Sequence, residues 1–271
     1  MEALAGGFDL VEAVRWSSDG SVTFADALGG GVHRWTTDGV ETIVPKRRGV
    51  GGLAFHADGG VVVSGRDLAH VRDGVTRQLH APGGVTGFND LTVAADGSVY
   101  AGALRFRPFG GEQVVPGEVW RLHPDGRDEV VCSGIDWPNG IGLSPDGSIL
   151  YVSDYQNARV MRCDASGAAD VVEVFATPPA GSTDGVAVDE AGGVWVALGD
   201  GAGVARFTAE GTLERVLDVP AAFVATVSFG GEDLRDLFIG TAGATEHPDR
   251  KGTLFRTRSD VPGLPLPLAR V

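Results

Sequence analysis

Four carboxylate or amide side chains stand at the same place in four of six similar segments of this 271-residue chain. Each segment is a pair of short apolar stretches joined by a tight turn. The position seven residues before each turn holds, in chain order, Glu12, Gly51, Asn89, Asn139, Asp184 and Thr226. Two carboxylates and two amide carbonyls are hard oxygen donors, and such donors suit a divalent cation such as Ca²⁺, Mg²⁺ or Mn²⁺.

A structural role is the alternative for any one of these residues, because Asn and Asp readily bond the backbone of a preceding turn. Four oxygen donors in one register around a shared axis favour a metal site instead. We expect one divalent cation, with Ca²⁺ as the first choice, while Mn²⁺, Mg²⁺ and Zn²⁺ remain open. No His or Cys, which are common zinc ligands, stands in this register.

The segments that must position these residues are predicted to be β-hairpins. In "PNGIGLSPDGSILYVSD" (138–154), for example, two apolar strands flank a Pro-Asp-Gly turn, where Gly supplies the positive φ of a tight turn. A second, more polar strand pair follows each hairpin. This gives six units of four strands, each of roughly 45 residues, which is the length of a propeller blade.

We therefore predict an all-β fold: a six-bladed β-propeller with four antiparallel strands per blade, forming one domain over residues 1–271. In a propeller the first strand of each blade lines a central channel. Equivalent positions in the six units then converge on one axis, where the four oxygen donors would meet in a metal site.

Two aspartates, Asp26 and Asp154, end the second strand of their hairpins, which returns to the face where the register residues lie. Either carboxylate could transfer protons at the rim of a pocket. The alternative is structural, since an aspartate at a strand end often bonds the turn that follows it.

Two connections on the same face, 104–118 and 242–252, are longer than a hairpin needs. Long loops on a rigid scaffold commonly carry substrate contacts. Their candidate groups for binding a substrate carboxylate or an oxyanion are Arg105, Arg107 and His247. Solvated surface charge is the alternative for each, and the five tryptophans are expected to pack in the core between blades.

The composition excludes several classes of partner. The formal net charge is −14, which would repel a nucleic acid over most of the surface. No stretch approaches the roughly 18 apolar residues of a membrane helix, and no signal-peptide pattern opens the chain. We expect a cytoplasmic protein with a small-molecule substrate, monomeric by default, with a dimer left open.

At these residues the chain resembles the regucalcin/gluconolactonase family of lactonase-type six-bladed propellers. The resemblance rests on "FNDLTVAADGSVYAG" (88–102), "PNGIGLSPDGSILYVSD" (138–154), "TDGVAVDEAGGVWVAL" (183–198) and "TVSFGGEDLRDLFIGTA" (226–242). It implies a single divalent cation held by Glu12, Asn139 and Asp184, with Asn89 close to the metal and facing the substrate. Members open sugar lactones, and relatives hydrolyse other lactones or phosphotriesters.

The chain also departs from the family pattern. Ala13 follows the first ligand, where the family often has Gly, and Gly87 stands where sugar-lactone members tend to carry an arginine. Four phenylalanines are expected to make the pocket more apolar than a sugar requires: Phe88, Phe106, Phe109 and Phe223.

The leading hypothesis is metal-dependent hydrolysis of a lactone by an activated water, with Asp184 as the first choice for the general base and Asp154 as the second. An alternative is a diverged enzyme that uses the cation as a Lewis acid on another electrophile, such as a phosphotriester, an aryl ester or a biosynthetic intermediate. A third possibility is a propeller that binds a partner without catalysis.

Overall fold

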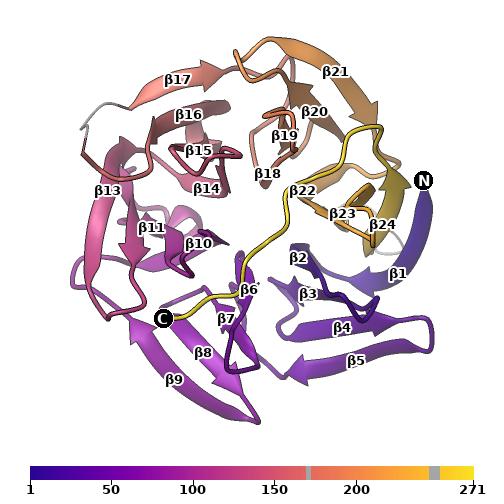
Figure 1. Ribbon diagram of the computed structural model, residues 1–271, viewed down its shortest axis with the longest axis horizontal. Helices are drawn as coiled ribbons and strands as arrows, with labels where there is room; N and C mark the ends of the chain where they lie inside the picture. The colour runs from indigo at the N-terminus through magenta and orange to yellow at the C-terminus, as the bar shows by residue number, and fades with distance from the viewer. Residues whose placement is uncertain (169–171, 244–250) are drawn as a thin grey trace.

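Six four-stranded antiparallel sheets form a ring around a central axis in the computed structural model, which describes residues 1–168, 172–243 and 251–271 (Figure 1). This arrangement confirms the predicted six-bladed β-propeller. Successive strands of each sheet run outward from the axis, so that the first hairpin of each repeat supplies the two inner strands.

The first three blades follow one another along the chain. Blade 1 comprises β2 (Val11–Trp16), β3 (Val22–Asp26), β4 (Val32–Thr36) and β5 (Gly39–Val44). Blade 2 comprises β6 (Leu53–Phe55), β7 (Val61–Val63), β8 (Leu68–Arg72) and β9 (Val75–His80). Blade 3 comprises β10 (Gly87–Val93), β11 (Val99–Leu104), β12 (Gly117–Leu122) and β13 (Asp128–Ile135), with a short 3₁₀ turn at Pro108–Gly110.

The last three blades complete the ring. Blade 4 comprises β14 (Pro138–Leu143), β15 (Ile149–Asp154), β16 (Arg159–Asp164) and β17 (Glu173–Ala176), with a 3₁₀ turn at Tyr155–Asn157. Blade 5 comprises β18 (Val186–Val188), β19 (Val194–Ala197), β20 (Gly203–Phe207) and β21 (Leu213–Asp218). Blade 6 comprises β22 (Phe223–Gly230), β23 (Asp236–Ala242), β24 (Gly252–Arg258) and β1 (Glu2–Phe8).

The ring closes through β1, which comes from the start of the chain and forms the outer strand of blade 6. It pairs antiparallel with β24, from Glu2 opposite Arg256 to Phe8 opposite Gly252. The Phe8 ring also packs edge-on against Phe24 of blade 1, with 4.9 Å between ring centroids. Closure in this way pairs the free edge of β24 and joins the last blade to the first.

The hydrophobic core lies between neighbouring blades rather than on the axis. Each of the six blade junctions has its own cluster of buried apolar side chains. Between blades 3 and 4, for instance, Val119 and Ile135 pack with Ile141, Leu150 and Val152. Because each blade packs only against its two neighbours, the axis is left for polar groups and cavities.

The two ends of the channel differ. We call the end where the inner strands begin the upper end, and the end at the first-hairpin turns the lower end. The segment 261–271, here called the tail, crosses the central opening at the lower end (Figure 1). Its backbone is tied to three blades through Leu264 N–H to Val188 O, Ala269 N–H to Phe55 O and Arg270 N–H to Gly97 O.

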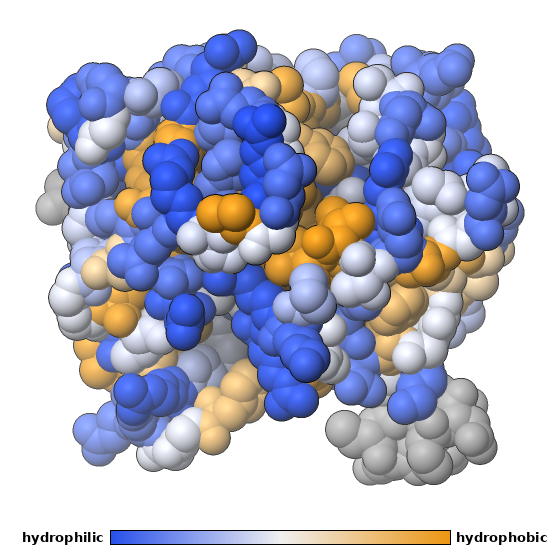
Figure 2. Space-filling model, turned by 90° about the horizontal axis from the view of Figure 1, so that it is seen from below, coloured by the Kyte–Doolittle hydropathy of each residue, from blue (hydrophilic) through white to orange (hydrophobic). Residues whose placement is uncertain are grey.

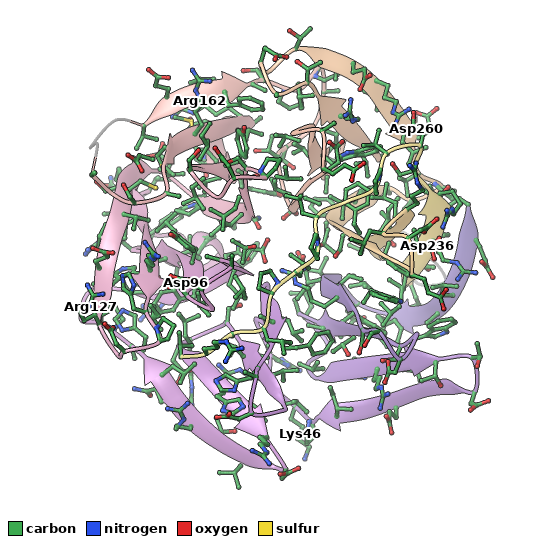
Figure 3. All side chains as sticks on the ribbon, in the orientation of Figure 1. Lys46, Asp96, Arg127, Arg162, Asp236 and Asp260 are labelled. Atoms are coloured by element: carbon green, nitrogen blue, oxygen red, sulfur yellow. The ribbon has the colours of Figure 1, made fainter. Side chains whose placement is uncertain are left out.

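The outer surface of the ring is largely polar. Seen from the side, hydrophilic residues cover most of the visible face, with smaller apolar areas between them (Figure 2). Charged residues such as Arg127, Arg162 and Asp260 lie at the periphery, away from the axis (Figure 3). None of the described helical segments has the length and hydrophobicity needed to cross a membrane.

We predict that deletion of residues 1–8 destabilises the ring, because β24 becomes an open edge and Phe24 loses one of its aromatic neighbours. Loss of the half-buried Phe8 ring alone costs about 1–1.5 kcal/mol, which corresponds to a fall of roughly 2–6 °C in Tm, and loss of the β1–β24 ladder adds to it. Calorimetry measures this change. The variant Glu2→Gln, which removes only an exposed ion pair with Arg256, should melt within about 2 °C of the wild type; equal Tm values for the deletion and the wild type would contradict the prediction.

Candidate functional site

The structure places the four predicted donors at the upper end of the inner strands. Glu12 lies in β2, Asn89 in β10 and Asn139 in β14, while Asp184 stands two residues before β18. Glu12, Asn139 and Asp184 are buried, and Asn89 is half-buried. The Asn139 amide hydrogen-bonds the Asp184 carboxylate, and the charge of Asp184 acts on Glu12. These three side chains, from blades 1, 4 and 5, therefore form one group.

Three of the four donors sit at β-bulges. The pairing register shifts between Glu12 and Arg15 in β2, between Phe88 and Leu91 in β10, and between Pro138 and Ile141 in β14. A bulge interrupts the regular alternation of side chains and can redirect a side chain away from the ladder. The bulges therefore fall at the strand starts where the polar residues turn toward the axis.

Close approach of neighbouring inner strands explains two glycines beside the donors. A Cβ atom on Gly140 would lie 2.2 Å from the carbonyl oxygen of Asp184. A Cβ atom on Gly51 would lie 2.2 Å from Oδ1 of Asn89. Gly51, which breaks the run of oxygen donors in the sequence register, is thus the residue that leaves room for the Asn89 side chain.

The two carboxylates of the group carry no compensating charge from the described protein. Burial raises the pKa of Glu12 well above its usual range, and the charges of Asp184 and Asp90 raise it further. Burial and the charge of Asp90 likewise raise the pKa of Asp184, against the hydrogen bond from Asn139. Within the described residues, neither carboxylate forms an ion pair, and Oδ1 of Asp184 is buried without a hydrogen-bond partner.

A third acidic residue, Asp90, lies next to Asn89 and was not expected from the register. Its carboxylate accepts hydrogen bonds from its neighbour Leu91 N–H and from Ile141 N–H of blade 4. Arg15 stands 3.7 Å away and donates to the Leu91 carbonyl across the channel. Burial raises the pKa of Asp90 to about 6, although Arg15 acts in the opposite direction.

Among the described residues, the carboxylates of Glu12, Asp90 and Asp184 outnumber the cations around them, and Arg15 is paired to Asp90. Among the described residues, no three His, Cys, Asp or Glu side chains form a cluster that could hold a metal ion. A cation at this place would depend on the amide oxygens as well as on the two carboxylates.

The two rim aspartates have structural partners. Asp154 is fully buried and accepts hydrogen bonds from the Trp137 backbone N–H, the Asn157 amide and the Arg159 guanidinium. Asp26 accepts backbone N–H groups of Asp9, Leu10 and Gly29. Both carboxylates thus fasten the turns at the upper face, which is the alternative role considered for them above.

The predicted substrate-binding cations are engaged by neighbouring acids. Arg105 makes a bidentate contact to Glu118, at 2.7 and 2.8 Å, and the same carboxylate accepts the Trp120 indole N–H. Arg107 is exposed and pairs with Glu112. His247 lies outside the described residues. Neither described arginine contacts the donor group.

Trp137 departs from the expected inter-blade position of tryptophans. Its ring lies beside Tyr155, with 4.6 Å between ring centroids, just before the strand that carries Asn139. Phe106 and Phe109 also contact this indole edge-on. Phe88, by contrast, packs in the core between blades 2 and 3 and cannot line the pocket.

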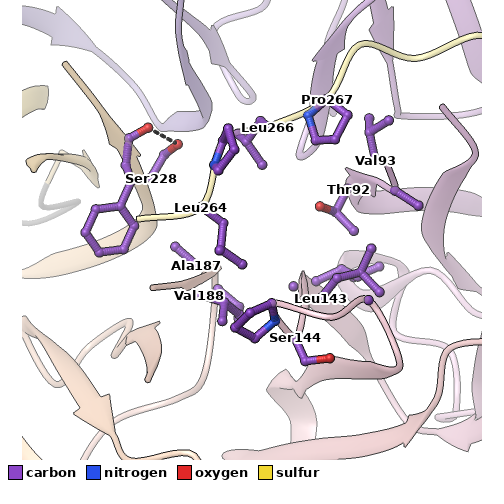
Figure 4. A pocket seen from close by; sticks show the side chains of 18 of the residues that line it. Thr92, Val93, Leu143, Ser144, Ala187, Val188, Ser228, Leu264, Leu266 and Pro267 are labelled. Atoms are coloured by element: carbon purple, nitrogen blue, oxygen red, sulfur yellow. Dashed lines mark hydrogen bonds between the residues drawn. The ribbon is translucent and has the colours of Figure 1, made fainter. Parts of the chain in front are cut away.

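Two cavities lie at the lower end of the channel, beneath the tail. Their volumes are about 280 and 340 Å³, and the tail residues Leu264 and Leu266 line both. Figure 4 shows these side chains opposite Val93, Leu143 and Val188 of the inner strands. Arg15 also lines both cavities, whereas none of the four register residues does. The acidic group and the cavities therefore lie on opposite sides of the Arg15–Asp90 pair.

Comparison with known proteins gives a consistent picture. The sequence model of the SMP-30/Gluconolactonase/LRE-like region matches residues 10–243. A 6-deoxy-6-sulfogluconolactonase of Pseudomonas putida is 30% identical over 279 residues, covering 96% of this chain and 94% of that protein. A pentonolactonase of Haloferax volcanii is 29% identical, with 89% and 88% covered. A gluconolactonase structure from Xanthomonas campestris superimposes with a TM-score of 0.79 at 26% identity, covering 97% and 89%.

We predict that Gly140→Ala destabilises the protein, because the new methyl group would meet the backbone of Asp184 and Val186. Overpacking of this kind costs about 1–3 kcal/mol. Chemical denaturation measures the change. Gly83→Ala is the matched control, since a Cβ atom there meets nothing within 4 Å, and it should change stability by no more than about 0.5 kcal/mol. A neutral Gly140→Ala variant would show that the inner strands are not tightly packed.

Proposed function

This chain belongs to the SMP-30/gluconolactonase/LRE-like family, and on that premise we propose that it is a hydrolase that opens a lactone with the help of one divalent cation. The observation that carries the proposal is the pair of buried carboxylates, Glu12 and Asp184. They are close enough for the charge of Asp184 to raise the pKa of Glu12. Oδ1 of Asp184 also lacks a partner in the described structure. A bound cation would satisfy both.

The donor set fits a hard cation. Glu12 and Asp184 supply carboxylate oxygens, and Asn139 supplies an amide oxygen beside Asp184. Asn89 is half-buried against Gly51, and we assign it to contact with either the cation or the substrate. Such oxygen ligands, with remaining positions left to water, are typical for Ca²⁺ and also accept Mg²⁺ or Mn²⁺.

The proposed reaction is the hydrolysis of a cyclic ester. When bound, the cation would supply Lewis acidity, which polarises a carbonyl and lowers the pKa of a water. The carboxylate of Asp184 accepts a proton from the attacking water, and the hydrogen bond from Asn139 holds that carboxylate in place. The water oxygen bonds to the carbonyl carbon, the ring C–O bond breaks, and the ring oxygen takes up a proton to give a hydroxy acid.

The structure favours Asp184 over Asp154 as the general base in this proposal. The Asp154 carboxylate is already bonded to a backbone N–H, an amide and a guanidinium. A proton acceptor needs a lone pair directed at the reacting water, and Asp184 keeps one oxygen without a partner among the described residues. We assign Asp154 to holding the upper turn of blade 4.

We predict that chelation abolishes lactone hydrolysis and that a divalent cation restores it. The assay measures acid release by a pH indicator from a panel of sugar, alkyl and aryl lactones, with Ca²⁺, Mn²⁺, Mg²⁺ or Zn²⁺ added back. Asp184→Ala should lose at least about 10³-fold in kcat/KM, because it removes both a ligand and the base. Full activity in chelator, or normal activity of Asp184→Ala, would overturn the proposal.

We also predict that Asp184→Asn is more stable than the wild type without metal and less stable than the wild type with metal. Without metal, the variant removes an uncompensated buried charge and should have a higher Tm than the wild type. With Ca²⁺ at about 100 times its Kd, the wild type should gain about 2.7 kcal/mol and the variant almost nothing.

Differential scanning fluorimetry with and without chelator reads out both states. The control is Asp38→Asn, an exposed carboxylate on the outer turn of blade 1, which should leave the response to metal unchanged. A variant that is less stable than the wild type in chelator would contradict the charge argument.

A further inference from the structure

Four aromatic side chains form a continuous group at the upper face, here called the aromatic wall: Phe106, Phe109, Trp137 and Tyr155. Trp137 contacts the other three, with ring centroids 5.9 Å from Phe106, 6.0 Å from Phe109 and 4.6 Å from Tyr155. The residues come from the β11–β12 connection, from the residue before β14 and from the 3₁₀ turn after β15. Separate segments thus meet on one indole ring.

The aromatic wall borders the acidic group. Trp137 lies two residues before Asn139, and Tyr155 directly follows the β15 strand end. The Tyr155 phenol is within electrostatic reach of the carboxylates, because the charges of Asp184 and Glu12 add to the effect of burial in raising its pKa, against a hydrogen bond with Ser182. The wall therefore begins beside Asp184 and extends outward over blade 4 toward the β11–β12 connection.

The outer end of the wall is exposed to solvent. Phe106 is 3% exposed, whereas Phe109 is 92% exposed and packs only its edge against Trp137. An aromatic ring left this exposed contributes little to the folded core, but it offers an apolar surface to a ligand. Nothing in the blade packing explains why Phe109 is apolar.

Trp137 also carries a polar group that the described protein leaves unused. Its indole Nε1–H is buried and has no hydrogen-bond partner among the described residues. Burying a donor without an acceptor is costly, and such groups are rare in native structures. A ligand oxygen placed along the aromatic wall would satisfy this donor.

The charged groups near the wall are already neutralised. Arg105 is held by both oxygens of Glu118, and Arg107 by Glu112. Recognition of a polyhydroxylated ring requires several free hydrogen-bonding groups, since each hydroxyl must replace its bonds to water. The described residues of the aromatic wall offer mainly aromatic surface, with one unpaired indole N–H and a Tyr155 hydroxyl that already bonds Ser182.

We propose that the aromatic wall is a substrate subsite for an aryl or alkyl substituent, so that this chain prefers lactones bearing an apolar group over free sugar lactones. The substituent packs on Phe109 and Trp137, and an oxygen of the substrate accepts the Trp137 indole N–H. This inference rests on the proposed lactone hydrolysis and adds the class of lactone.

The test compares three lactones at a fixed, saturating concentration of the restoring metal: dihydrocoumarin as an aryl lactone, γ-nonalactone as an alkyl lactone, and glucono-1,5-lactone as a polyhydroxylated one. For Phe109→Ala we expect a five- to tenfold loss of kcat/KM on the first two substrates, which is the effect of losing about one aromatic contact. The loss should appear in KM, because Phe109 is remote from the reacting carbonyl. Glucono-1,5-lactone should change by less than twofold.

Two further variants separate contact from structure. Leu28→Ala removes another exposed apolar side chain, 55% exposed, from the upper face of blade 1 and should change none of the three rates. Trp137→Phe keeps an aromatic ring but removes the N–H, so we expect it to retain packing and still lose about fivefold on dihydrocoumarin. A melting temperature within about 2 °C of the wild type confirms that each variant is folded.

The outcomes distinguish failure of the aromatic subsite from failure of the proposed lactone hydrolysis. If the metal-loaded wild type hydrolyses none of the three lactones, the proposed function fails. If it hydrolyses them but Phe109→Ala leaves all three rates unchanged, or lowers all three equally, the lactonase assignment stands and the aromatic subsite is wrong. A wild-type preference for glucono-1,5-lactone over both apolar lactones would also overturn it.

Discussion

Mutual repulsion between Glu12 and Asp184, buried at the upper end of the channel, is the electrostatic constraint that governs the rest of the site. Two carboxylates in a region of low polarity cannot both stay ionised without compensation. The protein provides partial relief through the Asn139 amide and places its nearest described cation, Arg15, beside Asp90 instead. The remaining negative charge is the basis of the proposed metal site, while the tail crosses the opposite, lower end of the channel (Figure 1).

Backbone packing holds these charges where they are. Neighbouring inner strands approach so closely that Gly140 has no room for a side chain. The Asn89 side chain occupies the place that a side chain at position 51 would take. Bulges in β2, β10 and β14 turn the polar residues toward the axis. Since the apolar packing lies between blades, blades 1, 3, 4 and 5 each act as a rigid support for one donor. The geometry of the site therefore follows from how six sheets meet around one axis.

The fold and the donor group could be predicted from the sequence because both depend on the repeat. The period of the hairpins determines the number of blades, and the shared position before each turn brings Glu12, Asn139 and Asp184 together. Asp90 and Arg15 were missed because regular alternation would point them away, and bulges alter that alternation. Trp137 was assigned to the core by residue type alone. The path of the tail has no counterpart in the repeat, so nothing in the pattern indicated it.

Closure of the ring by β1 has a consequence for the order of events during synthesis. The strand that pairs with it, β24, is synthesised only after all the strands of blades 1 to 5. Blades 1 to 5 each hold four strands that are consecutive in sequence and can assemble as they emerge. The β1 segment must wait, with an unpaired edge, until β24 has been synthesised. In the nascent protein β1 thus stays unpaired through the synthesis of five blades, which makes it a target for a chaperone.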